Sequence, residues 1–311
     1  MCKADAPSTS NITKTKAQPT RLLLSLESFS SKHGDPPSFA SCLITAAFIL
    51  AFLTGTEMTF RQFFLHFQDA HPLLEIETNR HILARHIGVD TLSCLIVFAT
   101  GWWSRHVCRG VIEAAFFGRG SEAMPDAGHE ERLYAYHPGG FRVALFFFCY
   151  QLKNLYDTIV WQDGPEFIFH HIFSLFTAWG SMVPGCGHYY TLFFFGMCEI
   201  STGVLCLLSN FDDDHGVPGL GDAMPMTKVV LGGIFVVLFI VCRCLLWPVF
   251  SRYFVNDCFL ALKGDDHRTK SRRGWLRFFL VSLTGLSILQ IAWLGEIFSQ
   301  GKQELAKAGL L

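Results

Sequence analysis

The residues of this sequence best suited to chemistry are ionisable side chains that lie inside long apolar runs. An ionisable group within a membrane span costs at least about 2.5 kcal/mol, so such groups are normally paired, hydrated or functional. The candidates for a catalytic site are His170, His171 and Asp157, and those for substrate binding include Glu199 and Arg243.

Asp157 and the two histidines lie on either side of a short turn. By helix rise, Asp157 precedes one membrane face by about four residues and His170 follows it by about three, each roughly 5–6 Å deep. A carboxylate beside an imidazole fixes its tautomer and raises its basicity, as general base catalysis or metal ligation requires. Adjacent histidines point about 100° apart on a helix, so only one faces a given substrate. Two alternatives stay open: half-solvated interfacial histidines, and a local ion pair of Asp157 with Lys153 at i−4.

Glu199 lies near the middle of an apolar run. A carboxyl group at that depth is expected to be protonated, hydrogen-bonded to a neighbouring helix or paired with a cation. Arg243, in the next apolar run, is the cation on offer. An ion pair that locks two helices and a site for a lipid headgroup both stay open.

Several other chemistries have no signature in the chain. It contains no His-x-x-His-His, Gly-x-Ser-x-Gly or Cys-x-x-Cys motif and no phosphate-binding Gly-rich loop. The composition of the His170 region allows a metal, but its spacing is not specific for one, so no metal site is predicted.

The elements that must position these residues are membrane helices. Only 16% of the 311 residues are charged, against about 25% in soluble domains, and a net charge of −1 excludes a nucleic-acid surface. Continuous apolar stretches disfavour a membrane barrel, whose strands alternate. We therefore expect an all-α polytopic membrane protein of about seven transmembrane helices, roughly at 38–56, 87–104, 141–161, 167–183, 188–208, 229–250 and 275–298.

The predicted domain organisation starts with a disordered polar tail over residues 1–37. A first transmembrane helix and a short interfacial helix fill 38–84, the latter because Phe60, Phe63, Phe64 and Phe67 recur at helical spacing. A membrane domain over 85–300 and a tail over 301–311 follow. Seven spans put 15 Lys and Arg on one side and six on the other, which predicts a cytosolic N-terminus.

Four stretches occur in a distinctive order and spacing: Tyr150 with Asp157, Glu166 to His171, the segment Glu199-Ile200-Ser201-Thr202, and Phe239 to Arg243 with Pro248. In these stretches the sequence resembles, over about residues 85–300, the TLC-domain family of multi-span membrane proteins, which includes ceramide synthases. The family fold implies a bundle or barrel of about six helices around a lipid-sized cavity, commonly in the endoplasmic reticulum.

In ceramide synthases, the His pair and a downstream His-Asp-x-x-Asp segment are thought to transfer an acyl group from acyl-CoA to a long-chain base. His170 and His171 match that pair, whereas Cys198, Glu199 and Thr202 replace the downstream His and both Asp. The Glu-x-Ser-Thr form resembles the non-synthase branch, which is linked to membrane lipid composition, sensing and trafficking. The charge count also places the His170 end on the non-cytosolic side, where acyl-CoA is not supplied.

We therefore expect a multi-pass protein, of the endoplasmic reticulum membrane, that binds acyl lipids and influences membrane lipid composition. One alternative is an acyltransferase with acyl-CoA as co-substrate and no other cofactor; the other is a lipid transport or trafficking receptor. The resemblance adds Tyr150 and Ser201 to the substrate-binding candidates. The expected partners are membrane lipids, and a homodimer stays open.

Overall fold

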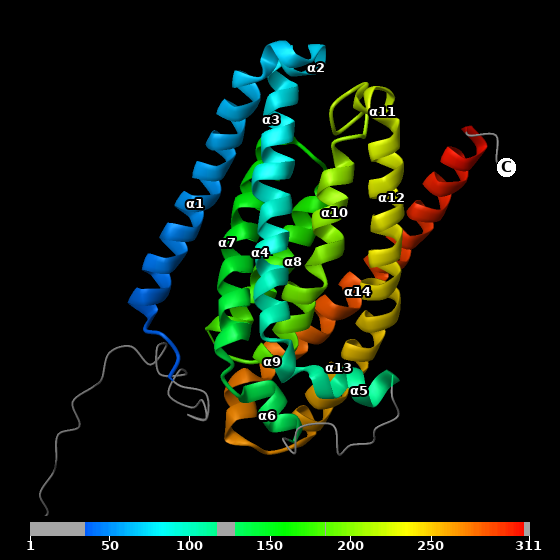
Figure 1. Cartoon of the computed structure of the whole chain (residues 1–311). Helices are drawn as coiled ribbons and strands as arrows, with labels where there is room; N and C mark the ends of the chain where they lie inside the picture. Colours follow the sequence, from blue (N-terminus) through cyan, green and yellow to red (C-terminus); the bar gives the residue numbers. More distant parts are fainter. Residues whose placement is uncertain (1–34, 117–127, 184, 308–311) are drawn as a thin grey trace, which may run out of the picture.

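The protein is a bundle of long helices, seen in a computed structural model that describes residues 35–116, 128–183 and 185–307 (Figure 1). The described residues contain no β-strand, which confirms the all-α prediction. The long helical segments are α1 (Phe39–His66), α3 (Glu77–Arg85) continued by α4 (Leu92–Trp103), α7 (Pro138–Trp161), α8 (Pro165–Met182), α9 (His188–Thr191) continued by α10 (Glu199–Ser209), α12 (Pro225–Phe239) continued by α13 (Trp247–Lys263), and α14 (His267–Lys307).

Four shorter helices lie at the ends of the bundle. In Figure 1, α2 (Pro72–Glu75) and α11 (Leu220–Ala223) lie at the upper end, whereas α5 (Arg109–Phe116) and α6 (His129–Tyr134) lie at the lower end with α9. We call the lower end the basic end, because most Lys and Arg of the connecting segments belong to it, among them those of α5, α6 and the start of α14. The turn between α7 and α8 lies at the opposite end.

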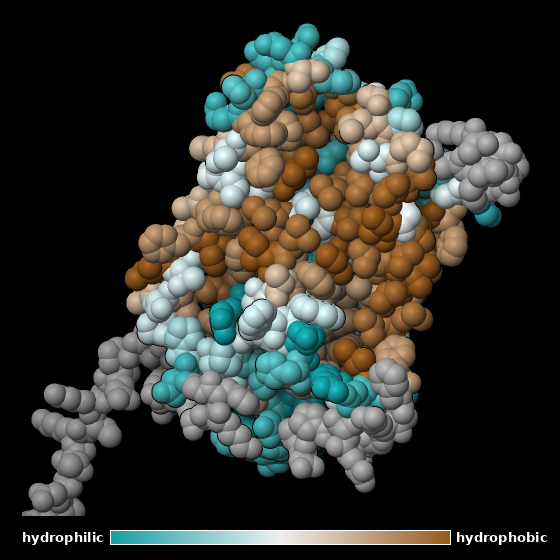
Figure 2. Space-filling model, viewed as in Figure 1, coloured by the Kyte–Doolittle hydropathy of each residue, from teal (hydrophilic) through white to brown (hydrophobic). Residues whose placement is uncertain are grey.

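Five segments of the described chain are long and apolar enough to cross a membrane: α1, α3–α4, α9–α10, α12–α13 and α14. The other two long helices, α7 and α8, lie alongside them in the bundle but carry more polar side chains. The number of seven spans is therefore not confirmed. Figure 2 shows the apolar belt between hydrophilic ends that a multi-pass membrane protein requires.

Three of the long segments each contain a π-helical stretch, at 86–91, 192–197 and 240–246. Such stretches are rare and often occur at functional sites, because the extra residue realigns the side chains that follow. Arg243 lies within the third stretch, and Glu199 begins the helix that follows the second. The irregular turns therefore position both members of the predicted ion pair.

Close helix packing in the centre of the bundle depends on small residues. Gly101 of α4 faces Gly196 of the second π-helical stretch, and a Cβ atom on Gly101 would lie 2.8 Å from the carbonyl oxygen of Leu192. Small residues allow membrane helices to approach in this way. The contact fixes α4 against the segment that leads to Glu199.

Two predicted boundaries are wrong. The residues from Phe60 onward are no separate interfacial helix, because α1 continues without a break to His66, and Phe60 packs against Gly88. Residues 301–307 are no separate tail either, since α14 extends to Lys307. The predicted disordered tail lies, up to residue 34, outside the described residues.

The positive-inside rule predicts that the basic end faces the cytosol. A glycosylation sequon in a flexible insertion within 211–219, before α11, should then be glycosylated in microsomes, whereas the same insertion at 264–266, before α14, should not. Gel shifts that endoglycosidase reverses provide the measurement. The opposite pattern of glycosylation would show that the basic end faces away from the cytosol.

Candidate functional site

Arg243 and Glu199 form an ion pair inside the bundle, which is one of the two arrangements that the sequence left open. The guanidinium Nη2 lies 3.0 Å from a Glu199 carboxylate oxygen, and the two side chains are 11% and 8% exposed. Arg243 also donates to the hydroxyls of Thr202 and Ser201, at 2.9 and 3.3 Å. Nε and Nη2 of the guanidinium thus join two helices.

Tyr150 reaches this ion pair through a cysteine. The Cys94 thiol donates to the Tyr150 hydroxyl at 3.7 Å and lies 3.8 Å from the second Glu199 carboxylate oxygen. The candidates Tyr150, Glu199, Ser201 and Arg243 therefore belong to one connected cluster. Cys94, on α4, is the member that the sequence analysis missed, since it carries no signal beyond that of an apolar residue.

The two histidines have different surroundings. Nδ1 of His171 lies 2.7 Å from the side-chain oxygen of Gln151, so this ring is held against α7. His170 packs edge-on against Trp293 of α14, with ring centroids 5.8 Å apart, and its Nδ1 is buried without a hydrogen-bond partner among the described residues. Nδ1 is therefore occupied in His171 and without a partner in His170 within the described chain.

Asp157 does not meet an imidazole. Its carboxylate lies 2.5 Å from the ammonium group of Lys153, which lies 2.8 Å from Glu57 of α1, and Glu57 also pairs with Arg61. No hydrogen bond joins Asp157 to either histidine within the described chain. The local pairing with Lys153 is what forms, and we call these four residues the charge ladder.

A second polar group lies between α3–α4 and α7. Arg85 binds the carboxylate of Asp163 in the α7–α8 turn, with contacts of 2.5 and 3.3 Å. Asp90, in the first π-helical stretch, is buried and contacts Asn154. One oxygen of each of these two side chains has no hydrogen-bond partner within the described residues. Buried waters commonly satisfy such atoms.

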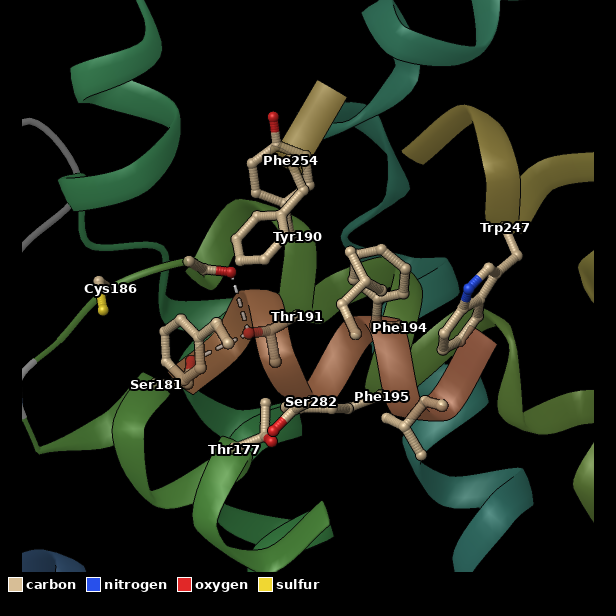
Figure 3. A pocket seen from close by; sticks show the side chains of 14 residues that line it. Thr177, Ser181, Cys186, Tyr190, Thr191, Phe194, Phe195, Trp247, Phe254 and Ser282 are labelled. Atoms are coloured by element: carbon tan, nitrogen blue, oxygen red, sulfur yellow. Dashed lines mark hydrogen bonds between the residues drawn. The ribbon is translucent and has the colours of Figure 1, made fainter. Parts of the chain in front are cut away.

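An apolar pocket lies next to the Arg243 cluster. Its cavity volume is about 50 Å³, and its walls come from α8, the α9–α10 segment, α13 and α14. In Figure 3, Trp247 lies on one side and Cys186 on the other, with Tyr190 and Phe254 together above them. The Arg243 guanidinium lies over the Trp247 ring, 5.3 Å from its centroid. Trp247 is therefore shared by the pocket and the polar cluster.

Two helix faces continue from the pocket to His170. On α8, Thr177 and Ser181 line the pocket, and His170 falls on the same face seven residues before Thr177, roughly 10 Å away. On α14, the lining face of Ser282 and Leu286 leads to Gln290 and Trp293.

Buried polar atoms mark this path. The Ser282 hydroxyl, the Gln290 side-chain oxygen and His170 Nδ1 all lack hydrogen-bond partners among the described residues. Unsatisfied buried polar atoms call for an explanation such as a water or a ligand. Sequence reasoning missed Gln290 and Trp293, because single polar or aromatic residues in an apolar run are not distinctive.

The pocket is closed toward the basic end by α6. Arg132 forms a bidentate ion pair with Asp257 of α13, with contacts of 2.6 and 2.7 Å, and the Tyr190 hydroxyl donates to the same carboxylate at 2.5 Å. The Gly187 amide donates to the carbonyl of Leu133 at 2.7 Å. These contacts connect α6 directly to the pocket wall.

The described residues hold no cluster of three or more His, Cys, Asp or Glu side chains in an arrangement suited to a metal ion. The chemistry on offer is that of one available imidazole, a buried ion pair and a pocket. This combination fits an amphiphile whose apolar chain and polar group occupy different parts of one site.

Comparison with known proteins gives one match. The family model for the TLC domain matches residues 79–299, which is most of the chain. No curated protein and no solved structure matches the chain.

We expect the charge ladder to be the main interaction that holds α1 against α7. Lys153→Met leaves Asp157 without a cation in a low-dielectric interior, so we expect the free energy of unfolding to fall by about 3 kcal/mol. Thermal unfolding in detergent measures the loss. The double variant Lys153→Met/Asp157→Asn should recover part of it.

Arg109→Gln is the matched control, since Arg109 is 73% exposed in its pair with Glu113. An exposed pair contributes about 0.5 kcal/mol or less. Equal losses from Lys153→Met and Arg109→Gln would contradict a structural role of the ladder.

Proposed function

This chain belongs to the TLC domain family, and we propose that it is an integral membrane protein that binds acyl lipids and thereby influences membrane lipid composition. The acyl chain would occupy the pocket of α8, α9–α10, α13 and α14, with the polar group of the lipid toward His170. We further propose the endoplasmic reticulum membrane as its location, from the resemblance to the family.

The observation that carries this proposal is the position of Trp247. One face of its ring lines the apolar pocket, and the Arg243 guanidinium lies over the ring. An amphiphile extending from the pocket therefore meets polar groups within one helical turn. The cavity volume of about 50 Å³ is far below the roughly 300–1,000 Å³ of formed ligand sites, so the pocket walls must move apart to admit an acyl chain.

Buried polar atoms without protein partners support a ligand with a polar group. Ser282, Gln290 and His170 each present one along the path from the pocket. Arg243 already binds Glu199 and Thr202, so the pair orients the site. A hydroxyl, amide or amine group of the lipid fits the hydrogen-bonding atoms of Ser282, Gln290 and His170.

Blocking the pocket tests the binding proposal. Ser282→Phe should fill it, because Ser282 is 2% exposed and lines its wall. We expect roughly tenfold less acyl lipid to copurify, the effect of about 1.4 kcal/mol in affinity. Lipid extraction and mass spectrometry, normalised to protein, give the measurement.

Val281→Phe is the control, because Val281 is adjacent in sequence but 63% exposed on the outer face of α14. It should retain the lipid of the wild type. Melting temperatures of both variants establish that they fold. Equal lipid content in folded Ser282→Phe and wild type would overturn the proposal.

A second candidate function, acyl transfer, is favoured by the free imidazole of His170. As a general base, His170 would take the proton of an amine while the amine nitrogen attacks the thioester carbonyl of acyl-CoA. An amide bond forms, the C–S bond breaks, and coenzyme A leaves as a thiol after receiving the proton. Only a site reached by acyl-CoA can perform this reaction, so the orientation test above bears on it directly.

His170→Ala and His171→Ala separate the two histidines. If acyl transfer occurs, His170→Ala should lower the rate at least about 100-fold, as loss of a general base does, while His171→Ala acts mainly through packing. Purified protein supplied with acyl-CoA and a panel of amine acceptors gives the rates. If no product depends on His170, acyl transfer at this site is excluded, and lipid binding remains as the proposed function.

A further inference from the structure

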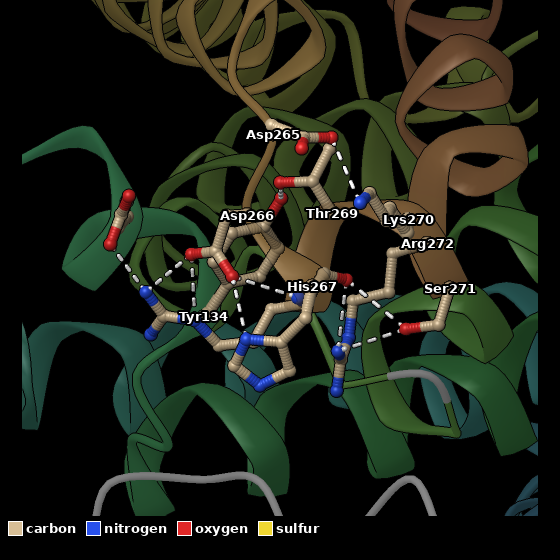
Figure 4. A network of polar contacts seen from close by, with 10 residues as sticks. Tyr134, Asp265, Asp266, His267, Thr269, Lys270, Ser271 and Arg272 are labelled. Carbon is tan, nitrogen blue, oxygen red and sulfur yellow. Dashed lines mark hydrogen bonds and ion pairs between the residues drawn. The ribbon is translucent and has the colours of Figure 1, made fainter.

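The first turns of α14 carry five basic side chains, and three of them are engaged by α6 and the preceding loop. Arg268 binds Asp266 at 2.7 Å and also pairs with Glu130, and Lys270 lies 2.9 Å from Asp265. Figure 4 shows this network. Hydrogen bonds from Arg268 lower the pKa of Asp266 to about 2, so this carboxylate stays ionised at physiological pH.

Tyr134 of α6 holds the third. The guanidinium groups of Arg268 and Arg272 lie 5.3 and 5.6 Å from the centroid of its ring, and its hydroxyl lies 2.7 Å from that of Thr269. Burial raises the pKa of Tyr134 to about 12, which keeps the hydroxyl neutral. The carboxylates of Glu130, Asp265 and Asp266 are thus matched to Arg268 and Lys270.

Arg273 and Arg277 are the other two of these five basic side chains. Neither forms an ion pair with a carboxylate of the described chain, and Nε of Arg273 is buried without an acceptor. They are four residues apart and so lie on one face of α14, one turn from each other. The long apolar part of α14 begins at this level, which places both at the boundary between water and lipid.

A shallow aromatic groove lies on the same turns of α14 as the two arginines. It is lined by Phe176 of α8 with Gly274, Trp275 and Phe278 of α14. Gly274 keeps the groove open, because nothing lies within 4 Å of the position of a Cβ atom there. Trp275 is fixed by close packing against Gly180 of α8. The groove is on the outer surface, whereas the pocket of Figure 3 faces the bundle interior.

We propose that Arg273, Arg277 and this groove bind an anionic phospholipid of the surrounding membrane. The planar guanidinium matches a phosphate in bidentate geometry, and two such groups without carboxylates leave a net positive charge for it. The acyl chain lies in the groove of Phe176 and Phe278. The basic end is predicted to face the cytosol, where the leaflet carries anionic lipids.

The lipid at this site bridges α8 and α14 from outside. It differs from the lipid of the interior pocket in location and in chemistry, because the outer site selects negative charge. The proposal therefore does not depend on the function proposed above. Its expected consequence is that anionic lipid stabilises the protein more than zwitterionic lipid does.

The test uses the full chain in nanodiscs of phosphatidylcholine, alone or with phosphatidylglycerol. For the wild type, phosphatidylglycerol should raise the melting temperature, and native mass spectrometry should show retained phosphatidylglycerol. The double variant Arg273→Gln/Arg277→Gln should bind phosphatidylglycerol roughly tenfold more weakly, since each basic residue near an anionic surface contributes substantially to the binding free energy. Gly274→Leu, which fills the groove and keeps both charges, should also weaken retention.

Arg252→Gln/Lys302→Gln is the matched control, because it removes two exposed positive charges elsewhere. It should retain the response of the wild type, as should the pocket variant Ser282→Phe. A loss as large in this control would show that only overall charge matters and would overturn the site. Equal stabilisation by inorganic phosphate without phosphatidylglycerol would identify a free anion as the ligand and would also overturn it.

Discussion

The structure depends on the pairing of charges inside a bundle that is surrounded by hydrocarbon. An isolated charge there is costly, whereas a hydrogen-bonded pair is tolerated. Lys153 serves two carboxylates at once, on its own helix and on α1, and Arg243 serves Glu199 together with two hydroxyls. Each pair needs a defined register between helices, so the pairs determine which packing of the apolar surfaces is stable.

The need to pair buried charges also distinguishes side chains with a structural role from side chains that are free to bind a ligand. Nε and Nη2 of Arg243 bind Ser201, Thr202 and Glu199, and Asp157 is neutralised by Lys153, so these groups already have partners within the protein. His170 is different, because its ring is buried against Trp293 while Nδ1 has no partner within the described chain. Other buried polar atoms of the described chain, such as those of Ser282 and Gln290, share this property, and each calls for a partner such as a water or a ligand. His170 lies on the helix face that continues from the apolar pocket.

Much of this arrangement follows from the sequence. Length and apolarity of the runs predict the helices, and the scarcity of cations in the spans predicts that Arg243 meets Glu199. The partner of Asp157 was predicted less well, because depth alone does not fix the direction of a side chain around a helix. Glu57 ends the first apolar run, so the sequence gives it no distinct signal. The prediction of a separate interfacial helix was wrong for a local reason, because no residue between Gly55 and His66 interrupts α1.

The π-helical stretches explain why the site could not be read from regular helical spacing. Each stretch adds a residue to a turn and rotates everything beyond it relative to an ideal helix. Arg243 lies within such a stretch and Trp247 directly after it, so the turn that aims the guanidinium at Glu199 also places the indole in the pocket wall. The polar cluster and the apolar pocket are therefore parts of one local distortion. A change that regularised this turn would move both together.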